Sequence, residues 1–105
     1  MKLVILESPF AGNVSENIVY ARACLRHSLL MGECPIASHL LYTQDGVLDD
    51  NDSTERALGI NAGLEWRSVA DATVVYADLG ISKGMEYGIN KMTNDGKPVI
   101  YRYIL

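Results

Sequence analysis

Short, continuously apolar runs alternate along the chain with longer segments whose apolar residues recur every three or four positions. The runs are residues 2–6, 35–38, 72–76 and 99–104. Unbroken apolar runs of this length are typical of strands that are covered on both faces, as in a parallel sheet. The amphipathic segments between them predict the crossover helices that parallel strands require.

Capping patterns mark where the first two helices begin. Asn13 is followed three residues later by Glu16, which is the spacing of a capping box. The helix that it opens is predicted to end at Gly32 and to bury one apolar stripe. That stripe consists of Ile18, Ala21, Leu25 and Leu29. Asp52 and Glu55 repeat the capping pattern and open a second helix toward Val69.

A third helix is predicted after the turn at Gly80. Its apolar stripe consists of Ile81, Met85, Ile89 and Met92, and the segment 94–98 ends it with Gly and Pro in the expected order. Three helices between four strands allow few topologies when crossovers are right-handed. We therefore expect one doubly wound, flavodoxin- or Rossmann-like α/β domain over residues 1–105, with a parallel sheet of strand order 2-1-3-4.

In such a sheet the loops after the first three strands meet in a crevice at the carboxyl ends of the strands. The first of these loops contains Ser8, Pro9 and Phe10, which can line a pocket for a flat ring. Phe10 could instead fill the core. After the second strand, Ser38, His39 and Tyr42 can bond a nucleobase or phosphate, or can satisfy the backbone of the following loop.

The third loop leads into a helix whose free backbone N–H groups would face the crevice. Gly80, Ser82 and Gly84 occupy this turn and are predicted to contact a ligand. Glu86 lies in the first turns of the helix, where the helix dipole favours the ionised carboxylate. This position suits a nucleophile or a base.

The acidic segment 44–52 has the length of a loop that covers a site. Its four aspartates lack the ligand ladder and the terminal Glu of a calcium-binding loop, so no metal site is predicted. Gly59 and Gly63 leave a smooth strip on the second helix, which with Trp66 could form a self-association surface or pack against this chain's own sheet.

Charge and composition exclude several classes of partner. The net charge is −4 with only nine Lys and Arg, which argues against a nucleic-acid surface. Cys24 and Cys34 lack metal-ligand or redox spacing and suit buried thiols in a reducing compartment. No apolar run is long enough to span a membrane, and residues 1–6 lead directly into a strand. We expect a cytoplasmic protein with no membrane partner.

Residues 84–88, Gly-Met-Glu-Tyr-Gly, follow Asp78 and a short glycine-containing turn. This run resembles the Gly-Met-Glu-x-Gly motif of the nucleoside 2-deoxyribosyltransferase-like superfamily, and the resemblance is clearest over residues 70–104. It implies that Glu86 is the nucleophile that attacks the anomeric carbon of a nucleoside, and that Asp78 positions or protonates the leaving base. It also implies a homo-oligomer, because the transferases complete their pocket with residues from a neighbouring subunit.

Two functions of different class follow from this resemblance. The first is an enzyme, a nucleoside deoxyribosyltransferase or N-glycosidase, and the intact motif favours it. The second is a binding protein that sequesters nucleotides without chemistry, as in a phage or a defence system, and the short chain favours it. In both cases the ligand is a small nucleoside or nucleotide. Because neither a P-loop nor a dinucleotide fingerprint is present, no cofactor is expected.

Overall fold

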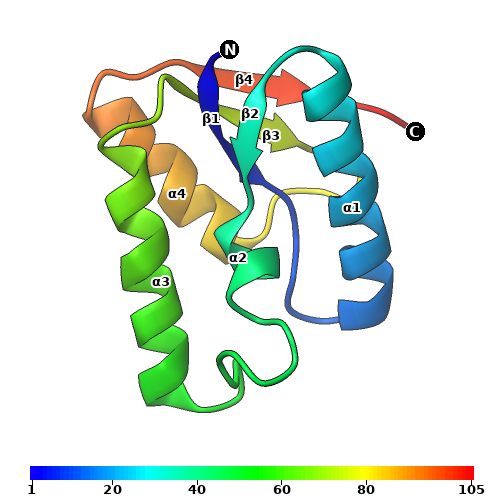
Figure 1. Ribbon diagram of the computed structural model, residues 1–105, viewed down its shortest axis with the longest axis vertical. Coiled ribbons are helices and arrows are strands. Elements are labelled where there is room, and N and C mark those ends of the chain that lie inside the picture. The colour runs from blue at the N-terminus through cyan, green and yellow to red at the C-terminus, as the bar shows by residue number, and fades with distance from the viewer.

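The computed structural model describes residues 1–105 and contains four strands and four helices (Figure 1). In chain order these are β1 (Leu3–Glu7), α1 (Val14–Leu30), β2 (Cys34–Ile36), α2 (Ser38–Leu41), α3 (Ser53–Arg67), β3 (Ala72–Tyr76), α4 (Lys83–Asn94) and β4 (Val99–Arg102). All strand pairs are parallel and the order is β2-β1-β3-β4. The predicted fold class and strand order are therefore confirmed, and the helices number four instead of three.

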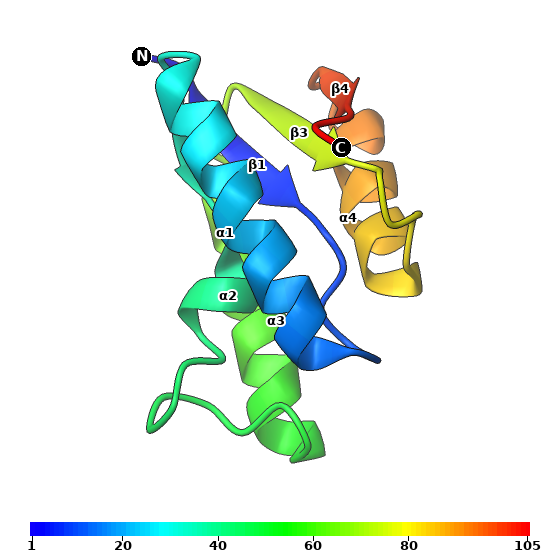
Figure 2. The ribbon, with the colours of Figure 1, turned by 90° about the vertical axis from the view of Figure 1, so that its right-hand side faces the viewer.

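The sheet is covered on both faces (Figures 1 and 2). The helix α1 lies on one face, and α3 and α4 lie on the other. Alternate residues of β1 point to opposite faces of the sheet. Val4 and Leu6 join the hydrophobic cluster that contains Tyr20 of α1. Ile5 joins the cluster that contains Met92 of α4. By the same two-residue period, Glu7 at the end of β1 projects to the face of α3 and α4.

The buried face of α1 differs from the predicted apolar stripe. Its most buried side chains include Asn17, Tyr20 and Cys24, whereas Leu29 is 53% exposed. Two of these buried side chains find polar partners at the carboxyl end of the sheet. Asn17 Nδ2 donates to the carbonyls of Phe10 and Ala11, and Tyr20 Oη donates to Asp78. The predicted stripe is correct at Ala21, which is buried, and at Leu25, which packs against the core, and it is wrong at Leu29. It missed Asn17 and Tyr20 because it counted only apolar residues as candidates for burial.

The second strand ends earlier than predicted, at Ile36, and residues 38–41 form the short helix α2. This helix packs against the glycine strip of α3. A Cβ added at Gly63 would lie 2.6 Å from Ser38 Oγ, and one added at Gly59 would lie 3.2 Å from Leu48. The strip therefore accommodates segments of this same chain. Of the self-association surface that the sequence suggested, Trp66 is the part that remains available, and it is 43% exposed.

Three smaller features bear on the sequence predictions. Cys24 is buried as expected, whereas Cys34 is exposed at the start of β2. None of the helices combines the length and the apolar character that a membrane crossing needs. Nowhere in the structure do three or more His, Cys, Asp or Glu side chains gather as a set of metal ligands.

Candidate functional site

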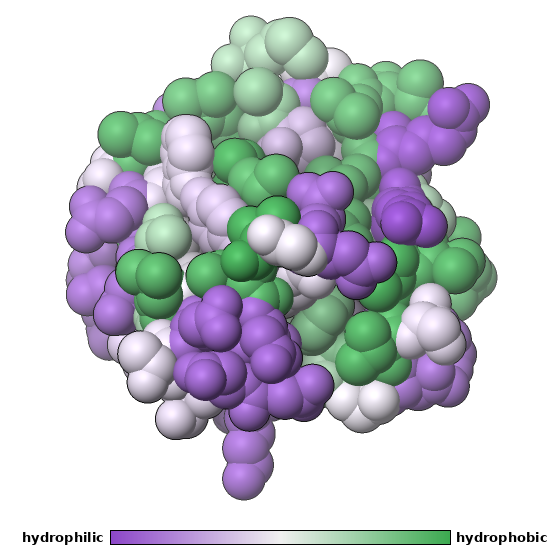
Figure 3. Space-filling view, turned by 60° about the horizontal axis from the view of Figure 1, so that its bottom comes forward, coloured by the Kyte–Doolittle hydropathy of each residue, from purple (hydrophilic) through white to green (hydrophobic).

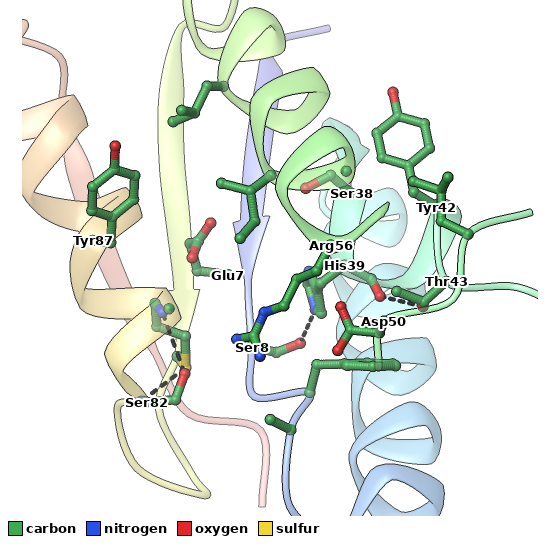
Figure 4. A pocket seen from close by; sticks show the side chains of 18 of the residues that line it. Glu7, Ser8, Ser38, His39, Tyr42, Thr43, Asp50, Arg56, Ser82 and Tyr87 are labelled. Carbon is green, nitrogen blue, oxygen red and sulfur yellow. Dashed lines mark hydrogen bonds between the residues drawn. The ribbon is translucent and has the colours of Figure 1, made fainter. Parts of the chain in front are cut away.

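A cavity of about 260 Å³ lies at the carboxyl ends of the strands, between the end of β1, α2, α3 and the first turn of α4 (Figure 4). Its volume is slightly below the range of about 300–1,000 Å³ that holds drug-sized ligands, so it suits a small ligand. Figure 3 looks toward this end of the molecule and shows polar and apolar residues interspersed on it.

Most of the predicted ligand-binding residues line this one cavity. They are Ser8, Phe10, Ser38, His39, Tyr42, Ser82 and Gly84. Pro9 is buried behind the lining, and Gly80 lies in the turn before α4 with a φ of +89° and does not reach the cavity. Leu48 and Asp50 bring the acidic segment to the cavity edge, so part of this segment borders the site.

A buried ion pair lies in the cavity wall. Arg67 Nη2, at the end of α3, donates to Glu7 Oε1 at 2.6 Å, and the two side chains are only 8% and 11% exposed. Burial raises the pKa of Glu7 to about 7, although the charge and hydrogen bond of Arg67 oppose this rise. The sequence predictions missed both residues, because Glu7 follows the apolar run 2–6 and Arg67 lies near the end of a predicted helix, where charged residues are usually solvated.

Gly88 of α4 makes room for this ion pair. A Cβ at Gly88 would lie 3.0 Å from both Cδ and Oε1 of Glu7 and would overlap Arg67 Nη2. The contact with Arg67 Nη2 is closer than real Cβ atoms show, and those with Glu7 are tighter than most, so the glycine allows the Glu7 carboxyl to lie directly against the α4 backbone. Three elements thus meet at this carboxyl, namely β1, α3 and α4.

Ser8 and His39 form a second polar pair in the cavity (Figure 4). Ser8 Oγ lies 2.7 Å from His39 Nε2, and a hydrogen bond joins them. Burial lowers the pKa of His39 to about 4, and the positive charge of Arg67 acts in the same direction. The imidazole is therefore neutral at pH 7, where it offers one N–H donor and one acceptor nitrogen.

The remaining charged groups at the cavity include two cations without carboxylate partners. The ion pairs of the structure are Arg67–Glu7 and Arg102–Glu33, so Arg56 and Lys83 are free to meet a ligand. Figure 4 shows the Arg56 side chain extending from α3 into the cavity toward Ser8. The carboxylates of Asp50 and Glu55 also line the cavity, so its charges are mixed.

The two residues that the motif indicated as catalytic lie outside the cavity lining. Glu86 is exposed on the outer face of α4, which it shares with Asn90 and Thr93. Asp78 accepts hydrogen bonds from Tyr20 Oη at 2.8 Å and from the Ile104 backbone N–H at 2.9 Å. In this structure Asp78 therefore ties the C-terminal segment to α1, and the catalytic roles of both residues stay predictions.

A parallel, Rossmann-like α/β sheet with a cavity of mixed polar and apolar lining beyond its carboxyl edge defines the class of this protein. In open sheets of this class, small ligands generally bind at that edge. The chain belongs to a family described as a domain of unknown function (DUF7768), whose model matches residues 2–102. No curated protein matches the sequence.

A solved structure extends the comparison to the fold. The chain is similar to a 2-deoxyribosyltransferase from the psychrotolerant bacterium Bacillus psychrosaccharolyticus, with a TM-score of 0.67 and 19% sequence identity. The match covers 96% of this chain and 72% of the transferase. At this identity the likeness establishes a distant structural relationship and a shared fold, and leaves the chemistry of this chain to its own residues.

Proposed function

We propose that this chain binds a nucleoside or a nucleotide in the cavity at the end of β1. One observation carries the proposal: the same small cavity combines the aromatic rings of Phe10 and Tyr87 with the hydroxyl of Ser8 and the neutral imidazole of His39. Aromatic faces stack on flat bases, while hydroxyl and imidazole groups bond the polar edges of a base or a sugar. The fold shared with a 2-deoxyribosyltransferase supports the same ligand class.

Binding is the part of the predicted function that the geometry supports best. Cleavage or transfer at the N-glycosidic bond through Glu86 would need that carboxylate at the ligand, and Glu86 does not line the cavity. Sequestration of a nucleotide needs only the cavity. The two versions differ in one observable, because an enzyme releases the base from its ligand and a sequestering protein does not.

Isothermal titration calorimetry with the common nucleosides and their 5′-monophosphates tests the binding proposal. Tyr87→Ala removes an aromatic ring from the cavity wall, and Tyr103→Ala is the matched control because Tyr103 is exposed and lies outside the cavity. Stacking of a base on an aromatic ring contributes about 1–3 kcal/mol, so affinity should fall roughly 5- to 100-fold in the first variant only. If the two variants bind the ligand with equal affinity, the base does not stack on Tyr87 and lies elsewhere.

Base release, followed by chromatography, separates the enzyme from the sequestering protein. Wild-type protein and Glu86→Gln are incubated with each ligand that binds. If Glu86 is the nucleophile, turnover disappears in the variant while binding persists. Equal base release by both proteins would remove Glu86 from the mechanism.

A further inference from the structure

The Glu7 carboxyl faces the cavity with one oxygen held and the other free. Oε1 accepts the hydrogen bond of Arg67, whereas no protein group donates to Oε2. Oε2 is not one of the fully buried side-chain atoms that lack a partner, so a small part of its surface is open, and Glu7 lines the cavity. The oxygen without a partner is therefore the one that a ligand can meet.

The surroundings hold this carboxyl in place. Arg67 of α3 holds the Glu7 carboxyl by its hydrogen bond. On the side of α4, Gly88 has no side chain that would displace this carboxyl. Among the other titratable groups of the cavity, His39 from α2 is neutral at pH 7. The remaining titratable side chains of the lining are Tyr42, Asp50, Glu55, Arg56, Lys83 and Tyr87. Among the carboxylates that line the cavity, only that of Glu7 is both buried and paired with a cation.

We propose that Glu7 is the acid–base residue of this cavity, where it protonates the leaving base of a nucleoside or nucleotide whose N-glycosidic bond is cleaved by water. This inference rests on the proposed binding function and adds a reaction to it. It places the chemistry on a carboxyl that no motif indicated, on β1 instead of α4.

The step balances with water as the only co-reactant. The proton moves from Glu7 Oε2 to a nitrogen of the base as the C–N bond breaks, and the electron pair of that bond leaves with the base. The oxygen of water bonds to the anomeric carbon. The proton that this water loses returns to the Glu7 carboxylate, so the products are the free base and the sugar with a new hydroxyl group.

The environment of Glu7 suits both halves of this cycle. A group that gives and takes a proton in turn works best when its pKa is near the working pH. Burial raises the pKa of Glu7 to about 7, so both protonation states are populated near neutral pH. The rate of base release should therefore fall as the pH rises above about 7, because the protonated form disappears.

The test compares Glu7→Gln with wild type in two measurements, base release by chromatography and affinity by calorimetry. Gln keeps the shape of the side chain and can still accept a hydrogen bond from Arg67, but it carries no proton to transfer. We expect base release to fall about 10²- to 10⁴-fold, the usual contribution of general acid–base catalysis, with less than a tenfold change in affinity. Glu65→Gln, an exposed position of α3 outside the cavity, is the matched control and should leave both unchanged.

Glu7→Asp covers the case in which Glu7→Gln does not fold. It keeps the acid but shortens the side chain by one methylene, so base release should fall while its decline above about pH 7 remains. Binding without base release by the wild type overturns the role of Glu7 and leaves the binding function intact. Base release by Glu7→Gln at the wild-type rate has the same consequence. Absence of binding for every ligand overturns the binding function itself.

Discussion

Replacing Gly88 by Ala tests whether the Glu7–Arg67 pair organises the cavity wall. The added Cβ would lie 3.0 Å from the Glu7 carboxyl and overlap the guanidinium of Arg67. The guanidinium of Arg67, which donates to Glu7, must then shift, and we expect this shift to break the pair. Breaking a buried pair costs about 3–5 kcal/mol, whereas Ala gains about 1 kcal/mol over Gly inside a helix. The net loss in the free energy of unfolding should be about 2–4 kcal/mol.

Gly84→Ala is the matched control for this measurement. It lies in the same helix, has no positive φ, and a Cβ there meets nothing within 4 Å. This variant should be as stable as the wild type or up to about 1 kcal/mol more stable. Urea unfolding followed by circular dichroism gives both values. If Gly88→Ala is as stable as Gly84→Ala, the ion pair does not depend on the space at Gly88.

Three further predictions concern pH, ligand charge and assembly. Burial raises the pKa of Glu7 to about 7 from an unfolded value of 4.5, so the folded state binds the carboxyl proton more tightly than the unfolded state. The stability that this protonation contributes is therefore lost as pH rises from about 4.5 to about 7. The loss should be roughly 3 kcal/mol in urea unfolding and absent in Glu7→Gln; a wild-type slope that persists in the variant would contradict it. Arg56→Ala should weaken binding of a 5′-monophosphate about 10- to 100-fold more than binding of its nucleoside, whereas Arg26→Ala on the exposed side of α1 should not. If the predicted homo-oligomer uses Trp66, Trp66→Glu should lower the mass measured by light scattering, and a monomeric wild type would end that prediction.

The arrangement of strands could be predicted because its signals are local. The run Ala72–Tyr76 is β-branched and continuous, and it forms the fully buried strand β3 with the predicted bounds. Asp52 caps α3 by accepting from the backbone N–H groups of Thr54 and Glu55, as its spacing indicated. The right-handed crossover rule then leaves the observed strand order as the natural one.

The buried ion pair in the cavity wall could not be predicted because it joins distant parts of the chain. Glu7 and Arg67 are 60 residues apart, and neither carries a local signal for burial. A charged residue is normally solvated, and only the assembled fold shows that these two side chains compensate each other. The same limit explains the buried Asn17, whose partners are backbone carbonyls of a preceding loop. The motif indicated α4, and the start of this helix does border the cavity, although Glu86 itself is not among the lining residues.

Nitrogen–proton correlation NMR can locate a nucleoside or nucleotide at the carboxyl end of β1, because a chain of 11.5 kDa gives well-resolved amide signals. Uniformly ¹⁵N-labelled protein is titrated with the ligand of highest affinity. If the ligand occupies the cavity, amide shifts should move around Ser8, His39 and Gly84, which line it, while those along the outer face of α1, such as Arg22, stay fixed. Shifts that cluster on α1 or on the exposed edge of β4, or no shifts at millimolar ligand, would contradict binding in the cavity.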